Sequence, residues 1–350
     1  MSLSKIKLLQ AISGGKNGGA EEFFVRLAIA FERAGLSQRV LVRDGRPWVK
    51  PMLVEGIDVV PISFRSNFSI SSRRHFRKQI RDFEPTHILT WMNRATRIGS
   101  GLEKNIPYTH LARLGGYYKI KNYKKCDHLI GNTKKIVSYV LDNGWPKERA
   151  HYLPNFVYSA QGDAISRSLL NTPLEVPLLL GLGRYHRNKG FDVLIEALTF
   201  LPTAYLWIAG EGPEKVKLQK QASELGVSER VRFLGWRNDV PALLAAADIF
   251  VCSSRIEPLG NIILEAWASR TPVVAASADG PIELIQSGNN GLLVPLEDPE
   301  GLSSAIKTLL NNYSIRDRLV EAGYQTYYES FEESNVVAKY ISLFTNTLKA

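Results

Sequence analysis

Short apolar runs that alternate with amphipathic helical patterns are the feature that most constrains this chain. The alternation begins with KIKLLQAI at residues 5–12 and AEEFFVRLAIAFERAG at 20–35, and it continues through QRVLVR and IDVVPIS. Runs of strand type separated by helices indicate βα units, whose strands pair in parallel. The pattern therefore predicts an α/β protein with open parallel sheets.

The alternation restarts at PLLLGLG, residues 177–183, after SAQGDAISRSLLNTP at 159–173, which has little apolar periodicity and is typical of a linker. A chain of 350 residues is also long enough for two ordinary cores. We predict an N-terminal Rossmann-like domain at 1–165, a C-terminal one at 166–330, and a helix at 331–350 that can cross back to the first. Ligands of such sheets bind outside the carboxyl ends of the strands, so a cleft between two facing domains is the expected site.

The charge is uneven along the chain. Residues 1–170 carry 28 Lys and Arg against 13 Asp and Glu, whereas 171–350 carry 16 against 21. A basic half of this kind attracts nucleic acid, an anionic membrane or an acidic acceptor. The segment RRHFRKQIRDF at 73–83 places Arg74, Arg77 and Arg81 at helical spacing, with Phe76 and Ile80 on a neighbouring face. We expect the apolar face to pack inward and the arginines to face an anionic membrane or acceptor.

A first candidate site is EPLGNIILE, residues 257–265, which follows the apolar run IFVCSS. A helix that begins near Asn261 offers free N–H groups and the positive end of its dipole to a phosphate, and Gly260 lets a ligand approach the backbone. One of the carboxylates, Glu257 or Glu265, could then accept hydrogen bonds from sugar hydroxyls, and the other from ribose hydroxyls. The alternative is an exposed, capped helix with incidental glutamates.

A second candidate is GLGRYHRNKG, residues 181–190, where Arg184 and Lys189 follow a strand and are suited to gripping a diphosphate. The G-x-G-x-x-G order of a dinucleotide-binding loop is broken at His186, which weakens an oxidoreductase interpretation. The alternative for both cations is an ordinary charged surface.

A third candidate is the glycine-rich turn SGGKNGGAEEFF, residues 13–24, whose backbone N–H groups could meet an anion. It lacks the order of a P-loop, and its alternative is a merely flexible turn. The sequence contains no H-E-x-x-H, C-x-x-C, D-x-D or G-x-S-x-G, so metal chemistry has no evident place. Cys126 and Cys252 are expected to be reduced, structural thiols of the cytoplasm.

Taken together, these stretches resemble glycosyltransferase family 4, retaining enzymes of GT-B architecture with two facing Rossmann-like domains. The resemblance is carried by GGAE, GRYHRNKGFDVLIEA, AGEGP, RVRFLGW and the E-x7-E segment, in family order over nearly the whole chain. It implies that the donor is held by the glycines of the first turn, the two cations, the residues after RVRFLG and the E-x7-E segment, namely Gly18, Gly19, Arg184, Lys189, Trp236, Arg237, Glu257, Gly260, Asn261 and Glu265.

Two further implications of the resemblance concern the sugar and the acceptor. Relatives have a histidine near the donor sugar, for which His110 in PYTHLARLGGYYK is the candidate, although Arg113 could occupy the position. The segment EPLG departs from the glycine-phenylalanine-glycine continuation of many relatives, so donor preference does not carry over. RLGGYYKIKNYKKCDHLIGNT is similar to transferases that build lipopolysaccharide cores, including mannosyltransferases.

The implied function is that of a retaining hexosyltransferase that moves a sugar from a nucleotide-diphosphate-sugar to an acceptor hydroxyl, without a metal or other cofactor. The expected acceptor is lipid-linked or of lipopolysaccharide type, and nucleic acid is not an expected partner. We expect the protein in the cytoplasm, peripheral at the inner face of an anionic cell membrane. The base of the donor, GDP, UDP or ADP, stays open. The competing classes are a GT-B sugar-nucleotide epimerase and a non-catalytic basic protein that binds membrane or nucleic acid.

Overall fold

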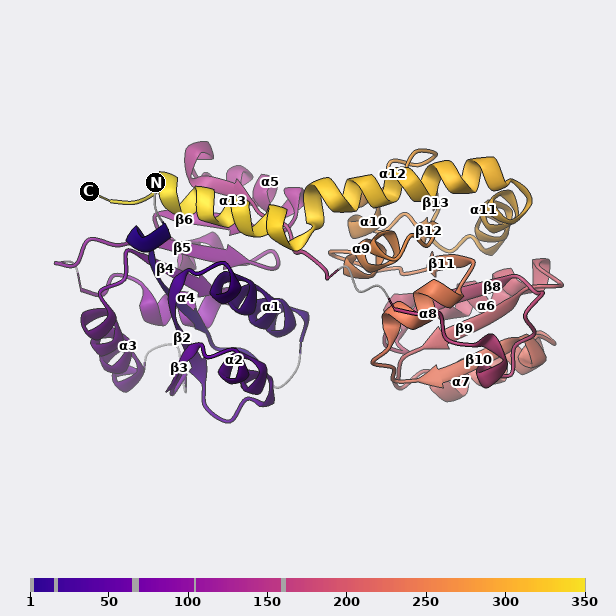
Figure 1. The fold of residues 1–350 in the computed structure, drawn as a ribbon, viewed down its shortest axis with the longest axis horizontal. Helices are drawn as coiled ribbons and strands as arrows, with labels where there is room; N and C mark the ends of the chain where they lie inside the picture. The colour runs from indigo at the N-terminus through magenta and orange to yellow at the C-terminus, as the bar shows by residue number, and fades with distance from the viewer. Residues whose placement is uncertain (1–2, 16–17, 65–68, 104, 159–161, 350) are drawn as a thin grey trace. The chain divides into compact units, whose positions relative to one another are not determined.

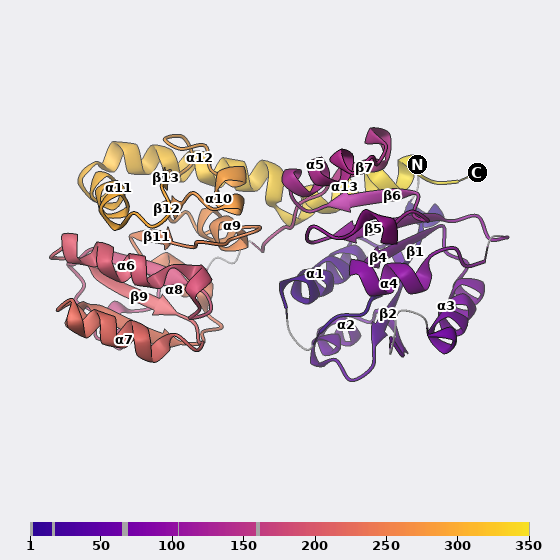
Figure 2. The same cartoon turned by 180° about the vertical axis from the view of Figure 1, so that it is seen from behind.

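Two compact α/β units make up the chain (Figures 1 and 2). The computed structural model describes residues 3–15, 18–64, 69–103, 105–158 and 162–349. Unit 1 comprises Met1–Asn155 and Glu333–Ala350, and unit 2 comprises Phe156–Glu332. Each unit contains one parallel sheet with helices packed on it, so the predicted class of two Rossmann-like α/β domains is confirmed.

The sheet of unit 1 has seven strands in the order β3-β2-β1-β4-β5-β6-β7, all paired in parallel. The order reverses beside β1, which is the switch point of a doubly wound sheet. The strands are β1 (Lys7–Ile12), β2 (Ser37–Arg43), β3 (Asp58–Ile62), β4 (His87–Trp91), β5 (Thr109–Leu114), β6 (His128–Gly131) and β7 (Ala150–Tyr152).

The helices of unit 1 cover both faces of this sheet, because right-handed connections that run in opposite directions from β1 lie on opposite faces. Helix α1 packs against α2 and α13 (Figure 1), and α3 packs against α4. The helices are α1 (Gly19–Arg33), α2 (Lys50–Val54), α3 (Ile70–Phe83), α4 (Met92–Gly99), α5 (Lys134–Asp142) and α13 (Glu333–Asn346), with short 3₁₀ turns at Leu3–Lys5, Pro47–Val49, Ile120–Asn122 and Lys147–Arg149.

Helix α3 contains the predicted basic and apolar faces. Phe76 and Ile80 are fully buried in the core that β1 and β4 form with α3 and α4, which confirms the inward packing of the apolar face. The helix begins earlier than the segment 73–83 because the Ser69 side chain accepts a hydrogen bond from the N–H of Ser72 and caps it.

The sheet of unit 2 has six parallel strands in the order β10-β9-β8-β11-β12-β13. Its core is formed by fully buried strand residues such as Leu180, Trp207 and Phe250 together with the helices on both faces. The strands are β8 (Leu178–Leu182), β9 (Tyr205–Ala209), β10 (Val231–Gly235), β11 (Ile249–Cys252), β12 (Val273–Ala276) and β13 (Leu292–Val294).

The helices of unit 2 follow the strands one by one until two longer helices end the unit. These are α6 (Phe191–Ala197), α7 (Lys215–Glu224), α8 (Val240–Ala246), α9 (Asn261–Ala268), α10 (Asp279–Leu284), α11 (Pro299–Asn311) and α12 (Tyr313–Phe331), with 3₁₀ turns at Arg167–Leu170, Arg187–Lys189, Leu198–Phe200 and Ser228–Arg230. No helix in the described ranges is both long and apolar enough to cross a bilayer.

The units divide earlier in the chain than the predicted boundary at 165/166. Val157 is buried in the core of unit 2, and its carbonyl accepts a hydrogen bond of 3.2 Å from the Tyr327 hydroxyl. Ile165 donates its N–H to the carbonyl of Ala242 in the same unit. The polar composition of 159–173 concealed these contacts, because backbone hydrogen bonds leave no mark in apolar periodicity.

Candidate active site

The carboxyl ends of the unit 2 strands bring the predicted donor residues to one edge of one sheet. Arg184 and Lys189 follow β8, Trp236 and Arg237 follow β10, and residues 257–261 follow β11. Parallel strands end at the same edge, and this is where open α/β sheets bind ligands. Residues far apart in sequence therefore come together at one edge of unit 2.

An ion pair joins two of the predicted residues directly. The Lys189 Nζ lies 2.5 Å from the Glu257 Oε2, and the two side chains are 24% and 11% exposed. The same carboxylate accepts longer hydrogen bonds from the Ser254 hydroxyl at 3.4 Å and from the Gly260 N–H at 3.3 Å. Glu257 is thus held as a hydrogen-bond acceptor at the strand ends, with a cation beside it.

The β11–α9 turn is built around Gly260. Its φ of 74° lies in the left-handed region, and a Cβ added there would meet Leu284 Cδ1 at 2.9 Å. Helix α9 then begins at Asn261, where it was predicted, and Glu265 is its fifth residue and half-buried. The first turn of α9 therefore points its N–H groups toward the edge that carries Lys189 and Glu257.

Arg184 and Arg237 differ in their partners. Arg184 is exposed and makes no ion pair within the described part of the chain, so its charge is available to a ligand. Arg237 donates to Asp239, with Nε 2.8 Å from Oδ1, and this hydrogen bond lowers the pKa of Asp239. Trp236 is 67% exposed, with its Nε1 donating to Asn238 Oδ1. The indole face is open, whereas the Arg237 guanidinium is already engaged.

The glycine-rich turn of unit 1 holds a carboxylate that the sequence did not single out. Residues 16 and 17 lie outside the described ranges, but Gly18 caps α1 and Gly19 is its first residue. The Glu21 carboxylate is buried and accepts a hydrogen bond of 2.5 Å from the Gly15 N–H, and a Cβ on Gly18 would lie 2.4 Å from its Oε2. A glutamate three residues after the cap is a common capping signal, which is why it drew no notice as a site residue.

The structure corrects the placement of His110. It is the second residue of β5, at the amino rather than the carboxyl half of the strand, and it is 2% exposed. Its Nε2 lies 2.9 Å from the Thr90 hydroxyl, its Nδ1 has no hydrogen-bond partner among the described residues, and burial lowers its pKa to about 4. His110 is therefore a neutral core residue, because the strand register, which the sequence leaves undefined, sets it back from the edge.

Arg113 lies three residues closer to the carboxyl end of β5 but is also enclosed. Its guanidinium stands 4.6 Å from the ring centroids of both Phe23 and Trp91. It donates to the Tyr340 hydroxyl at 2.9 Å and to the Asn155 Oδ1 at 2.5 Å. Arg113 thus fastens α1, β4 and α13 of unit 1 together.

The basic face of α3 is partly neutralised. Arg77 and Arg81 both pair with Glu103, at 2.8 and 2.9 Å, whereas Arg74 is exposed and forms no ion pair with a described residue. Arg73 turns instead to the end of α4, where it donates to the carbonyls of residues 97, 98 and 100. The outward charge is therefore smaller than the sequence predicts.

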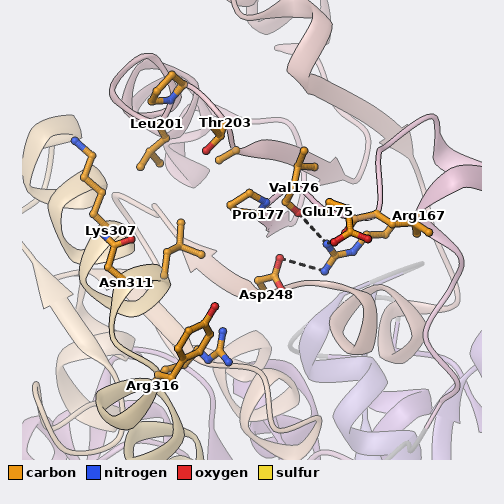
Figure 3. A pocket seen from close by; sticks show the side chains of 15 residues that line it. Arg167, Glu175, Val176, Pro177, Leu201, Thr203, Asp248, Lys307, Asn311 and Arg316 are labelled. Atoms are coloured by element: carbon orange, nitrogen blue, oxygen red, sulfur yellow. Dashed lines mark hydrogen bonds and ion pairs between the residues drawn. The ribbon is translucent and has the colours of Figure 1, made fainter.

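A pocket of about 430 Å³ lies at the opposite edge of the unit 2 sheet (Figure 3). Val176 and Pro177 line it just before β8, and Arg167 fills part of it by pairing with Asp248 at 3.1 Å. None of the predicted donor residues lines this pocket, so it is separate from the candidate site. In the described ranges no three His, Cys, Asp or Glu side chains are grouped to hold a metal, and Cys126 and Cys252 are buried and free.

Comparison with known proteins decides the family. The pattern described as "Glycosyl transferases group 1" matches residues 165–326. The chain is 37% identical over 336 residues to the lipopolysaccharide core biosynthesis glycosyltransferase LpsE of Rhizobium meliloti (strain 1021), a match that covers 95% of this chain and 97% of that protein. The chain belongs to the group 1 glycosyl transferases.

Other relatives of this group 1 glycosyl transferase agree. LpsD of the same organism, also a lipopolysaccharide core biosynthesis glycosyltransferase, is 34% identical over 94% of this chain and 96% of its own length. HepE of Anabaena, solved in complex with UDP and glucose, superposes with a TM-score of 0.81 at 21% identity over 97% of this chain and 100% of that one. A glycosyltransferase from Rickettsia africae reaches 0.86 at 18% identity, over 98% and 99%. The fold is that of these enzymes, and family membership makes the chain a hexosyltransferase.

Proposed function

We propose that this transferase moves a sugar, with retention at the anomeric carbon, from a nucleotide-diphosphate-sugar to a hydroxyl of a lipopolysaccharide-core type acceptor. The observation that carries the proposal is the grouping of Arg184, Lys189 and the start of α9 at one edge of unit 2, beside Glu257. LpsE and LpsD, lipopolysaccharide core biosynthesis glycosyltransferases that match nearly the whole chain, support this acceptor class.

In the proposed mechanism, departure of the nucleoside diphosphate builds negative charge, and positioned cations stabilise it. Arg184 and Lys189 would meet the two phosphates, and the positive end of the α9 dipole, at the start of the helix, would meet the same charge. Glu257 would orient sugar hydroxyls, and Glu265 would bind the ribose. With two cations and a helix start at the leaving group, we propose that the reaction proceeds without a metal.

Two parts of the proposal concern the surroundings. The basic half and the exposed Arg74 support a peripheral contact with an anionic membrane that presents the acceptor. The two free thiols fit a reducing compartment, so we propose that transfer takes place at the cytoplasmic face. An epimerase or a non-catalytic binding protein has no observation in its favour.

The test is incubation of the protein with radiolabelled UDP-, GDP- and ADP-sugars, with and without truncated lipopolysaccharide as acceptor, in the presence and absence of EDTA. We expect label to enter the acceptor from one donor class, with the anomeric configuration kept in the product and with full activity in EDTA. Donor consumption without acceptor would indicate an epimerase or hydrolase instead. Loss of activity in EDTA with rescue by Mg²⁺ or Mn²⁺ would refute the metal-free mechanism.

A further inference from the structure

Arg255 forms the most extensive side-chain ion-pair cluster in the described part of unit 2. Its Nη1 and Nη2 lie 2.7 and 2.8 Å from the two carboxylate oxygens of Asp192, and Nη2 and Nε also bond to Glu297. Hydrogen bonds to Asp192, then to Glu297, raise the pKa of Arg255, and Arg255 in turn lowers the pKa of Glu297. The Arg255 side chain is 17% exposed, so solvent screens its pair with Asp192 less than it screens a fully exposed pair.

The segment around Arg255 also holds the turn that carries Lys189. The three consecutive carbonyls of residues 187–189 all accept hydrogen bonds from the segment after β11. Arg255 Nη1 donates to the Arg187 carbonyl at 2.8 Å, the Arg255 N–H to Asn188 at 2.8 Å, and the Ser253 hydroxyl to Lys189 at 2.9 Å. The backbone of Lys189 is therefore fixed against the segment that leads into Glu257.

The cluster connects the end of the turn that carries Lys189 to the start of the loop that carries Glu257. Asp192 lies in the first turn of α6, just after Lys189, and Arg255 lies two residues before Glu257. The rigid fork of an arginine that binds two carboxylates fixes direction as well as distance, which a lysine does not do. Stabilisation of a leaving group needs donors held within roughly 0.5 Å of their working positions.

We propose that Arg255, together with Asp192, is a positioning device that sets the geometry of Lys189 and Glu257 for donor activation. This inference rests on the proposed function, since it assigns Arg255 a role in that same donor site. Arg255 acts through its neighbours and is not itself expected to touch the donor. Glu297, with a side chain 55% exposed, contributes less than Asp192.

The test is a double-mutant cycle between Arg255→Gln and Lys189→Ala, with sugar transfer as the readout. In the parent protein Arg255→Gln should lower kcat/KM by roughly 10- to 100-fold, whereas in the Lys189→Ala background it should cost less than about 3-fold. Arg255→Lys should recover only a small part of the loss, and Asp192→Asn should cost more than Glu297→Gln. Should Arg255→Gln fail to fold, Asp192→Asn, which keeps the guanidinium, takes its place in the cycle.

Arg270→Gln is the matched control, because Arg270 pairs with Glu321 at 2.6 Å on the surface of the same unit. It should leave kcat/KM within about 2-fold of the parent. Equal losses from Arg255→Gln in both backgrounds would overturn the positioning role while leaving the proposed function intact. Absence of transfer by the parent protein, together with absence of UDP, GDP and ADP binding by calorimetry, would overturn the proposed function and this inference with it.

Discussion

The carboxyl edges of the two sheets differ although the units share one architecture. In unit 2 ion pairs connect the loops at this edge: Lys189 pairs with Glu257, and Arg255 pairs with Asp192. In unit 1 Arg113 is enclosed by the aromatic rings of Phe23 and Trp91, and in the described part of the chain it donates to a hydroxyl and an amide oxygen rather than to a carboxylate. The fold fixes where loops gather, and the side chains decide whether that place binds an anionic ligand or closes the core.

The units also differ in histidine. Four of the six histidines stand on neighbouring strands of unit 1, at or near their amino ends, whereas His186 is the only one in unit 2 and is exposed. Two of the four, His87 and His110, are at most 2% exposed, and burial lowers the pKa of each to about 4. The two units should therefore respond differently to acid.

The largest expected effect is the acid sensitivity of unit 1. Between pH 6.5 and about 4 the unfolded chain binds protons at His87 and His110 that the folded chain does not, so stability falls as the pH drops through this window. Each residue should cost about 2 kcal/mol at about pH 5. Hydrogen exchange at neutral pH and at about pH 5 should show lost protection in unit 1 peptides and little change in unit 2.

Variants make this contrast sharper. His87→Asn should remove the contribution of His87, about 2 kcal/mol at about pH 5, from the acid sensitivity of unit 1, whereas replacement of the exposed His75 by Ala should not alter it. Equal loss of protection in both units at about pH 5 would mean that the buried histidines do not control acid stability.

The second effect concerns the charged edge of unit 2. Lys189→Ala and Arg184→Ala should each lower kcat/KM by roughly 100- to 1,000-fold, or about 2.7–4 kcal/mol, because in the proposed mechanism each removes a donor to the leaving group. Steady-state kinetics with saturating acceptor measure it. Lys220→Ala is the control, since Lys220 forms an exposed pair with Glu224 at 3.4 Å and should leave the rate unchanged. A similar loss of kcat/KM in Lys220→Ala would mean that the activity depends on the total charge of unit 2 and not on the cations at the carboxyl ends of its strands.

The third effect is on nucleotide affinity. Glu265→Ala should weaken nucleotide binding by roughly 1.5–3 kcal/mol, the range of hydrogen bonds to a charged group, while α9 persists because alanine favours helix. Calorimetry with UDP, GDP and ADP measures the change. In unit 1, Glu21→Gln should change the nucleotide affinity less, since the Glu21 carboxylate already accepts a hydrogen bond from the Gly15 N–H. An unchanged nucleotide affinity in Glu265→Ala would contradict the proposal that Glu265 binds the ribose.

The smallest effect concerns α3 of unit 1. Reversing Arg74 to Glu should weaken binding to anionic liposomes, measured by sedimentation, by about 1 kcal/mol. Reversing Arg77 or Arg81 should weaken it by less, because Glu103 already neutralises both. The triple reversal should abolish sedimentation at low salt. Lys307→Glu, a similar reversal on an exposed lysine of unit 2, is the control. A parent protein that ignores anionic liposomes at low ionic strength would end the membrane proposal.

Much of the fold follows from the sequence because strands and helices have their own periods. The apolar runs predicted the strands of both sheets, and the segment EPLGNIILE after one of them predicted a helix that begins near Asn261. The boundary between the units was predicted less well, because Arg167, in a segment of linker composition, donates hydrogen bonds to the carbonyls of Ala246 and Val176. Such contacts depend on tertiary structure and leave no pattern in composition.

The sequence could predict which loops form the candidate site, but not which side chains in those loops contact one another. Residues after parallel strands must share an edge, so Arg184, Lys189 and Glu257 could be grouped from the sequence. That Lys189 contacts Glu257, and that Arg255 donates a hydrogen bond to the carbonyl of Arg187, depends on where two loops meet in space. His110 was misplaced for a related reason, since the start and register of a strand decide which residue reaches its end.

Unit 1 is assembled from two stretches of chain, with all of unit 2 between them. Helix α13 supplies the Tyr340 hydroxyl that Arg113 donates to and the Phe344 ring that lies 5.3 Å from His87. During synthesis α13 leaves the ribosome after unit 2 is complete. Until then the Arg113 guanidinium and the His87 imidazole of unit 1 lack the α13 side chains that pack against them. Unit 2 is one continuous stretch of chain and needs no later segment to complete it. The second half of the polypeptide can therefore finish folding before the first, and a chain that stops at residue 332 would leave the first half open.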